Sequence, residues 1–293
     1  AGSKLAAQME EAKTLTSAFV NFVLPNASAI FHATTEVKTE SDKEIMKMSV
    51  ENSFAQATSQ FDQQGLEGEP RELVDGLFAT LKDIMMKTVD EGKFDGVASL
   101  SVADDTLSVL IGGQLADGKA LEQELKNFID GLPDNDKKPV AEFNYATFEG
   151  VTLHRLTVPS NSSDPVVDKV FGENLTLIIG TADKGFMLAL DPTGDAVLKA
   201  AIQKMQSSDA TAVQPVKGVV ELASILRYAQ SVSPNSMLDL AVDAVEQYSG
   251  KDKIQLDASV IPRGMIYRFT IEEGVLRAIG TVAKAGGGAG GGF

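Results

Sequence analysis

The stretch NLTLIIGTADKGFMLALDPTGDAVLKAAIQKM, residues 174–205, decides the fold class of this chain. It begins with two short apolar runs separated by TADK, which is the spacing of a β-hairpin with Gly185 closing the turn. The segment that follows places Val197, Ala201 and Met205 on one face at helical spacing. The sequence therefore predicts a unit of strand, turn, strand and helix.

The joint DPTGD, residues 191–195, admits two interpretations, a ligand loop or a helix start. Asp191 or Thr193 can accept a backbone N–H as a helix cap, Pro192 fits a first turn, and Asp195 suits the positive end of the helix dipole. A phosphate-binding loop carries several glycines and a lysine, which DPTGD lacks. We therefore expect a strand-to-helix joint that binds neither metal nor phosphate.

The same order of strand, turn, strand and helix recurs along the chain. Further copies are predicted over residues 97–128, 143–172 and 253–283, of which 143–172 is the weakest. Helices that follow hairpins, rather than linking parallel strands, indicate antiparallel or mixed sheets with helices packed on one face. The expected fold is an α+β protein built from repeated β-hairpin-helix units.

In the copy over residues 253–283, apolar and polar residues alternate along the strands, which predicts that one face of the hairpin packs on the core. Leu256 and Phe269 are expected to be buried, each contributing about 1.5–3 kcal/mol. Asp257 and Arg268 are expected on a face exposed to solvent.

Paired glycines suggest an internal duplication. Gly250 follows Gly92 by 158 residues, and each glycine ends a predicted amphipathic helix before a hairpin. Gly274 follows Gly118 by 156 residues, so the offset is nearly constant. We expect a first α+β half over residues 1–139, a second, related half over 140–284, and a Gly-rich tail over 285–293.

Two segments are less clearly organised. Residues 5–23 have the apolar period of one helix, yet residues 17–34 with the following SDKEIMKMSV also match a degenerate copy of 174–205, and both interpretations stay open. SSDATAVQP, residues 207–215, has the composition of a linker.

Charge and composition exclude several partners. The chain has 41 Asp and Glu against 26 Lys and Arg, so its net charge of −15 repels nucleic acid and anionic lipid headgroups. No apolar stretch approaches the ~20 residues that span a bilayer, so we expect no membrane span. Cysteine is absent from the sequence, which excludes disulfides and thiolate chemistry.

Motifs for catalysis or metal binding are missing from the sequence. The two histidines, His32 and His154, have no His, Cys or carboxylate at ligand spacing, so we expect both to be structural. Asp130, Asp134 and Asp136 lie close together but lack the order of an EF-hand loop. We predict no catalytic, cofactor-binding or metal-binding residue.

Two stretches resemble a known group of proteins. IPRGMIYRFTIEEGVLRAIG, residues 261–280, and LIGGQLADGKALEQELK, residues 110–126, are similar to stretches of exported planctomycete-type bacterial proteins of unknown function. The resemblance implies export and a repeated hairpin-helix build, and it transfers no functional residue. The opening AGSKLAAQ suits a mature end left by a signal peptidase and equally a trimmed chain. The acidic composition without Cys or Trp and the Gly-rich tail favour an extracytoplasmic protein: periplasmic, on the cell surface or secreted.

Three functions are compatible with these features. The favoured one is a non-catalytic exported structural or assembly component of the cell envelope or extracellular space, which self-associates or binds another envelope protein, with the tail held by a neighbouring chain. The second is a periplasmic carrier of an apolar ligand held between a curved sheet and its helices. The third is a hydrolase with dispersed carboxylates.

Overall fold

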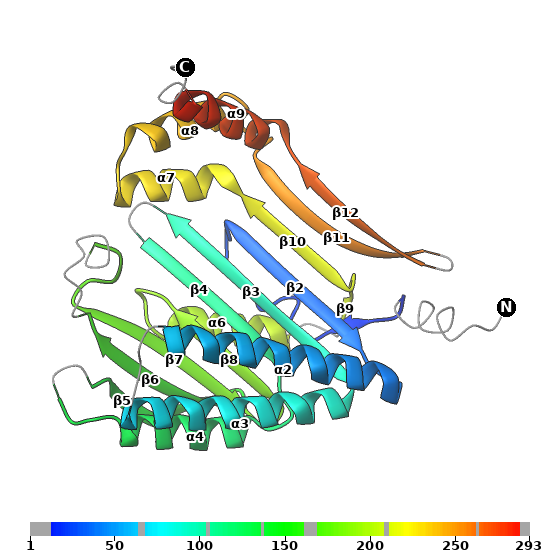
Figure 1. Ribbon diagram of the computed structural model, residues 1–293, viewed down its shortest axis with the longest axis vertical. Helices are drawn as coiled ribbons and strands as arrows, with labels where there is room; N and C mark the ends of the chain where they lie inside the picture. The colour runs from blue at the N-terminus through cyan, green and yellow to red at the C-terminus, as the bar shows by residue number, and fades with distance from the viewer. Residues whose placement is uncertain are drawn as a thin grey trace.

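A ten-stranded antiparallel sheet forms the centre of the molecule (Figure 1). The computed structural model describes residues 13–63, 68–103, 106–135, 138–160, 169–207, 211–261 and 264–287. Across the sheet the strands are β12 (Gly264–Ile271), β11 (Lys253–Ile261), β10 (Val216–Glu221), β2 (Ala29–Glu36), β3 (Lys93–Ala103), β4 (Thr106–Gln114), β8 (Gly185–Leu190), β7 (Asn174–Ala182), β6 (Val151–Pro159) and β5 (Val140–Phe148). The α+β class with an antiparallel sheet is confirmed.

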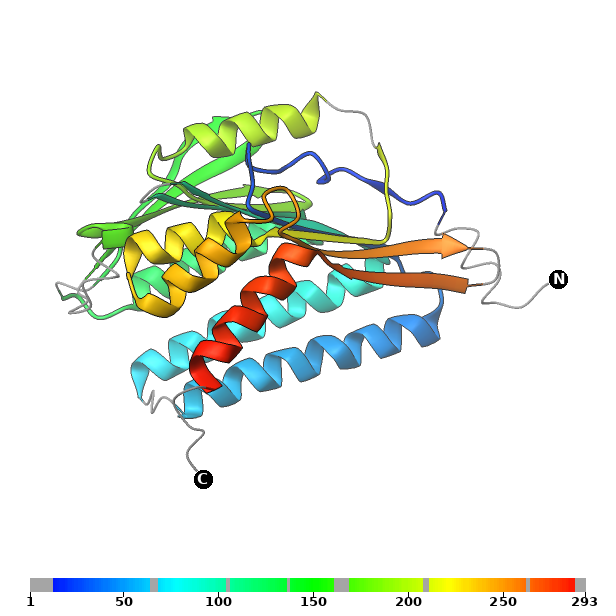
Figure 2. The same cartoon turned by 90° about the horizontal axis from the view of Figure 1, so that it is seen from above.

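Helices lie on both faces of this sheet (Figure 2). One face carries two groups, which are α2 (Glu40–Gln63), α3 (Glu69–Glu91) and α4 (Gly118–Gly131), and α7 (Leu222–Val232), α8 (Ser236–Glu246) and α9 (Glu273–Gly287). The other face carries α6 (Ala196–Gln206) and the N-terminal segment before β2. Helices were expected on one face, and α6 departs from that expectation because its buried side chains complete the main core.

The main core lies between the sheet, α6 and the N-terminal segment. Phe19 and Phe22 meet edge to face at 6.0 Å and pack with buried Leu110 and Leu198. A Cβ at Gly112 would stand 2.7 Å from the Phe22 ring, so only glycine lets this ring approach β4 closely.

The N-terminal segment is neither a helix nor a hairpin copy in its described part. Residues 13–28 form turns and the short strand β1 (Thr16–Ser17), which pairs with β9 (Thr211–Ala212). The helix expected over residues 5–23 is therefore wrong from residue 13 onward, and residues 5–12 lie outside the described part. The degenerate copy over 17–34 is wrong too, since this stretch adds a single strand, β2, to the main sheet.

Three of the four predicted hairpin-helix units are present. They are β3–β4–α4, β7–β8–α6 and β11–β12–α9. Asp117 caps α4 by accepting a hydrogen bond of 2.9 Å from the Ala120 backbone N–H. The remaining copy forms the hairpin β5–β6, whose turn has positive φ at Glu149 and Gly150. Of the helix expected within the 143–172 copy, residues 169–171 are helical, and residues 161–168 lie outside the described part.

One order of elements occurs twice in the chain. Strand, helix, helix, hairpin and helix follow one another in β2–α2–α3–β3–β4–α4 and in β10–α7–α8–β11–β12–α9. Gly92 and Gly250, which follow the second helix of each set, both have left-handed φ, at 76° and 79°. The duplication and the boundary at 139/140 stay predictions, and a single sheet runs through both expected halves because β2 pairs with β10 and β4 with β8.

Three local expectations are corrected. Phe269 is 65% exposed and Leu256 is only half-buried, although both were expected to be buried, because they lie on the face of the sheet that the described helices leave uncovered. Part of the linker expected over 207–215 is strand β9. The start of the tail expected over 285–293 belongs to α9, which continues to Gly287, and residues 288–293 lie outside the described part.

The two helix groups leave the middle of the sheet uncovered on their side. Figure 1 shows β10, β2 and β3 running between α7–α9 at one end and α2–α4 at the other. The α2–α3 pair is held by edge-to-face contacts of Phe78 with Phe54 and Phe61. Within the described ranges, no helix combines the length and apolarity needed to cross a membrane.

Candidate binding groove

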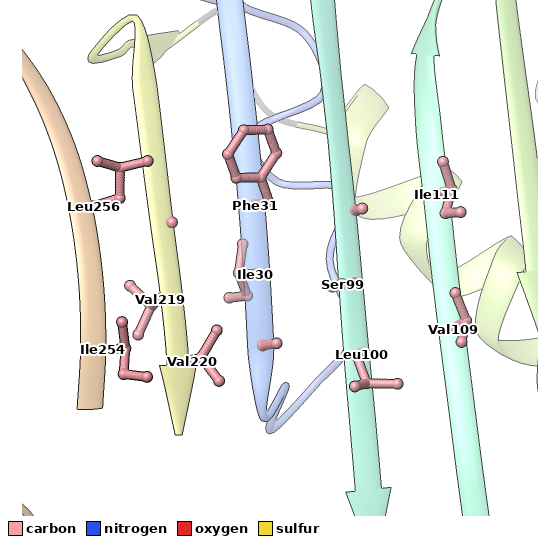
Figure 3. Close-up of a pocket in the computed structure, with 13 residues that line it drawn as sticks. Ile30, Phe31, Ser99, Leu100, Val109, Ile111, Val219, Val220, Ile254 and Leu256 are labelled. Carbon is pink, nitrogen blue, oxygen red and sulfur yellow. The ribbon is translucent and has the colours of Figure 1, made fainter. Parts of the chain in front are cut away.

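An apolar groove with a volume of about 340 Å³ lies on the uncovered face of the sheet (Figure 3). Its floor is formed by five adjacent strands, β11, β10, β2, β3 and β4. Neighbouring strands stand about 4.8 Å apart, so the four steps make a trough roughly 19 Å long.

Strand register arranges the floor in two rows that run across the strands. The first row is Leu256, Gly218, Phe31, Ala98 and Ile111, each residue being the direct partner of the next. The second row is Ile254, Val220, Ala29, Leu100 and Val109, joined in the same way. Large and small side chains alternate along the first row, so Gly218 and Ala98 form hollows beside the ring of Phe31.

The floor faces away from the main core. Side chains alternate along a strand, and Val97 and Leu110, next to Ala98 and Ile111, point into the core under α6. The groove residues therefore point to the side of the two helix groups, and none of the described helices covers them. Phe31 remains 48% exposed and Ile111 39% exposed. Partly exposed side chains of this size make the floor available to a ligand.

Among the described residues, those that line the groove are almost all apolar. Ser99 is the one polar residue that lines it, and its hydroxyl accepts the Leu24 backbone N–H at 3.0 Å on the buried face. All other lining residues are aliphatic, aromatic or glycine. The described lining of the groove thus offers apolar contacts.

His32 belongs to a buried polar cluster behind this sheet. Its Nε2 lies 3.0 Å from the Ser17 hydroxyl and 3.5 Å from an Asp95 carboxylate oxygen. The Ser17 hydroxyl donates to Asp95 at 2.6 Å, and the Ala18 backbone N–H donates to the second carboxylate oxygen at 2.7 Å. Burial raises the pKa of Asp95, but the hydrogen bonds from His32, Ser17 and Ala18 bring it below its usual value of 3.8.

Serine, histidine and aspartate here form an anchor, not a nucleophile. The Ser17 hydroxyl already accepts the backbone N–H groups of Phe19 and Val20, at 3.0 and 2.8 Å. Ser17, His32 and Asp95 are all buried, so no substrate carbonyl can approach the hydroxyl. The cluster ties the N-terminal segment to β2 and β3. Asp95 was not predicted from the sequence, although a carboxylate on the strand face shared with Val97 and Ser99 is a signal for a buried partner.

His154 is the centre of a second polar cluster. Its Nδ1 accepts the Asn144 backbone N–H at 3.1 Å, so the neutral ring carries its proton on Nε2, 2.9 Å from the Thr181 hydroxyl. Thr181 donates to Glu122 at 3.1 Å, and Lys126 donates to the same carboxylate at 2.5 Å. Burial lowers the pKa of His154, which Glu122 opposes and Lys126 reinforces.

A bulge in β5 positions this second cluster. The register of β5 against β6 shifts between Glu142 and Ala146, and Asn144 within the bulge has φ of 54°. The bulge aims the Asn144 N–H at His154. Both histidines link separate elements of the fold through their contacts, and the carboxylates and hydroxyls around them come from distant strands and helices.

The DPTGD joint has the geometry of a strand-to-helix connection. Asp191 accepts the Thr193 backbone N–H at 2.7 Å and also accepts the hydroxyl of Ser108, in β4, at 2.6 Å. The cap expected at Asp191 or Thr193 is wrong, because Asp195 occupies the cap position of α6. The Asp195 carboxylate caps no backbone N–H there; it pairs with Lys199 at 2.7 Å and accepts the Tyr145 hydroxyl at 3.1 Å. Burial and the Asp195 carboxylate raise the pKa of Tyr145 to about 12.

The acidic loop after α4 is only partly described. Asp130 lies in the last turn of α4 and Asp134 in the loop, while Asp136 lies outside the described residues. In the part of the chain that the structure describes, no group of three or more His, Asp or Glu side chains is placed to hold a metal ion.

Comparison of the chain with protein-family models, with curated proteins and with solved structures gives no match. A function is therefore inferred from the chain's own residues.

Proposed function

We propose that this protein is a non-catalytic binding protein that holds an apolar, chain-shaped ligand in the groove across β11, β10, β2, β3 and β4. The observation that supports this most strongly is the pair of aligned apolar rows, because ten residues from five strands give one continuous surface. A volume of about 340 Å³ is within the range of small-molecule sites.

The shape and charge of the site narrow the ligand class. A trough roughly 19 Å long and two side chains wide suits an extended hydrocarbon chain better than a compact ring system. Apolar surface removed from water contributes about 25 cal/mol per Å², which favours a ligand that covers both rows. The net charge of −15 disfavours an anionic headgroup, so the ligand is neutral or cationic at its polar end.

The hydrolase alternative lacks support in the described part of the chain. A general acid at neutral pH needs a raised pKa. Burial raises the pKa of Asp95 and Glu122, but hydrogen bonds bring both below their usual values. Ion pairs with Lys119 and Lys199 lower the pKa of Asp183 and Asp195.

An extracytoplasmic location is part of this proposal. It is supported by the cysteine-free composition and by the resemblance of residues 261–280 and 110–126 to exported proteins. Fractionation of the source cells, followed by antibody detection, tests it. Recovery in the cytoplasmic fraction would contradict it.

The assembly role remains the second candidate. The observation that favours it is the exposed edge strand β12, whose Tyr267 and Phe269 are both largely exposed. A partner that adds a strand to this edge, rather than a ligand in the groove, is what that role requires.

The binding proposal is tested on protein purified from its own source. Native mass spectrometry of this protein should show one retained apolar molecule per chain, which is lost on organic extraction. The extracted protein should then bind the neutral dye Nile red at one site, and a long-chain fatty alcohol should displace the dye.

Variants separate the groove from other apolar surfaces. Ala98→Glu places a charge in the floor and should weaken dye binding at least ~10-fold, since a buried unpaired charge costs several kcal/mol. Gly218→Val fills a hollow without a charge, because its Cβ would meet Phe31 at 3.4 Å and Leu256 at 3.6 Å, and it should weaken binding in a folded protein. Ile45→Glu, on the exposed side of α2, is the control and should bind as the wild type does. Equal binding by all three variants would refute the groove as the site.

A further inference from the structure

Strand β12 is an unprotected edge of the main sheet. Within the described residues it pairs only with β11, and four consecutive residues, Ile266, Tyr267, Arg268 and Phe269, are exposed. Arg268 is its single charged residue, and the strand has no proline and no shift of register against β11. An edge strand offers unpaired backbone N–H and C=O groups to another strand. Natural edge strands therefore usually carry several charged residues, a proline or a bulge, which prevent such pairing.

The opposite edge shows the contrast within the same molecule. Strand β5 is interrupted by the bulge between Glu142 and Ala146, and Asn144 there has a left-handed φ. Glu142 also forms an ion pair with Arg155 at 2.5 Å on this edge. One edge is thus protected against strand addition and the other is left open.

The apolar surface at β12 continues the floor of the groove. Phe269 is the direct partner of Leu256, and Ile271 is the direct partner of Ile254, so both rows extend to the edge. A partner strand must therefore present large apolar side chains on the same face with matching alternation. A second copy of β12 meets this requirement because its edge carries the same rows.

We propose that two copies of this chain pair antiparallel through β12 and extend the sheet across the dimer. Antiparallel strands are related by a two-fold axis perpendicular to the sheet, so the same face of each copy lies on the same side. The two-fold axis passes through the pair formed by Phe269 of the two copies. Tyr267 of each copy then lies opposite Ile271 of the other. In this register Arg268 lies opposite Thr270, whereas an axis at Arg268 would oppose like charges. The grooves of the two copies then form one continuous apolar surface.

The affinity of the two copies for each other should depend on the salt concentration. Each copy has a net charge of −15, and β12 contributes no acidic residue, so repulsion between the copies comes from the rest of the molecule. Added salt screens this repulsion, and the dimer should therefore tighten as the ionic strength rises.

Mass in solution is the first test. Sedimentation equilibrium of ligand-free protein over a range of concentrations should show an equilibrium between one and two chains, shifted toward the dimer by salt. Phe269→Lys should shift it to the monomer by more than ~10-fold, because it opposes two charges at the axis. Val140→Lys, at the 64% exposed Val140 of β5, is the matched control and should leave the dimer unchanged. Far-ultraviolet circular dichroism checks that both variants are folded.

Cross-linking is the second test, and the absence of cysteine makes it direct. Directly opposed residues in antiparallel strands have Cα atoms about 4.5–5.5 Å apart, which a disulfide can bridge. Phe269→Cys should therefore form a covalent dimer under mild oxidation, and Val140→Cys should not. Wild type that keeps the mass of one chain at every concentration, or equal cross-linking at both positions, would overturn the proposal. Both dimer experiments use ligand-free protein, so a negative result would not contradict the groove proposal. Likewise, failure of Nile red to bind would not contradict the dimer proposal.

Discussion

At the scale of single residues, each histidine connects a strand to a distant part of the chain. His32 joins β2 to Ser17 and Asp95, and His154 joins β6 to Thr181 in β7, with Glu122 of α4 3.8 Å away. Buried polar groups must find partners inside the protein, since an unmatched one costs about 1–3 kcal/mol. Both histidines therefore fix local geometry.

His154 should give the protein a pH-dependent stability. Its pKa in the folded protein lies below 6.5 because the ring is buried, so the unfolded chain binds a proton that the folded one excludes. The stability that comes from the neutral ring is present above pH 6.5 and is lost as the pH falls through the folded pKa. His154→Gln should cost about 1–3 kcal/mol at neutral pH through its lost hydrogen bonds. Its deficit relative to wild type should shrink in more acidic buffer.

Urea unfolding of both proteins at about pH 7 and about pH 5 measures this difference. Glu122 is the carboxylate of this network. Burial raises its pKa, but hydrogen bonds from Lys126 and Thr181 hold that pKa below its usual value of 4.5, which separates its titration from that of the histidine. A deficit of the same size at both pH values would show that the ring does not titrate between them.

At the scale of elements, turns and helix ends explain why the predicted units form. Gly92 ends α3 in the left-handed conformation, and its backbone N–H reaches the carbonyls of Thr88 and Val89. Gly250 has nearly the same φ after α8 but stands in open space. The two glycines are equivalent in conformation and different in packing.

This difference predicts unequal costs for the same substitution. Gly250→Ala should destabilise the protein by about 1–2 kcal/mol, the cost of placing a Cβ in the left-handed region. Gly92→Ala should cost clearly more, because its Cβ would also stand 2.5 Å from the Val37 carbonyl oxygen. Thermal and urea unfolding of the two variants compare them directly. Equal costs would mean that the Val37 carbonyl moves away without penalty.

The hairpin-helix units could be predicted because their information is local. A turn, two alternating strands and a capped helix lie within about thirty residues, and propensity acts over that distance. The short β1–β9 pair could not be predicted, since it joins Thr16–Ser17 to Thr211–Ala212. The exposure of Phe269 was missed for a related reason, because alternation marks the two faces of a strand but does not say whether anything covers either face.

At the scale of the whole molecule, the sheet makes the two expected halves depend on each other. Strand β2 is completed by β10, and β4 is completed by β8, across the boundary at 139/140. A fragment of residues 1–139 would expose both β2 and β4 as open edges. It would also lose α6, whose Leu198 and Ile202 are fully buried against the main core.

We therefore expect residues 1–139 alone to aggregate or remain incompletely folded. Mixed refolding with residues 140–293 should restore the circular dichroism spectrum and the elution volume of the intact chain, since the missing strand partners return. Size-exclusion chromatography of each fragment and of the mixture measures this. A fragment 1–139 that is monomeric and unfolds cooperatively would show that the first half is an independent domain.

The sequence by itself determined the α+β class and most of the hairpin-helix units. These properties depend on residues close together in the chain, where turn chemistry and periodicity act directly. Only the tertiary structure decided the groove, whose floor combines residues near positions 30, 99, 110, 219 and 255. Their alignment depends on the register of five strands distant in sequence, and no local preference specifies which apolar residues stand side by side or which edge of the sheet remains open.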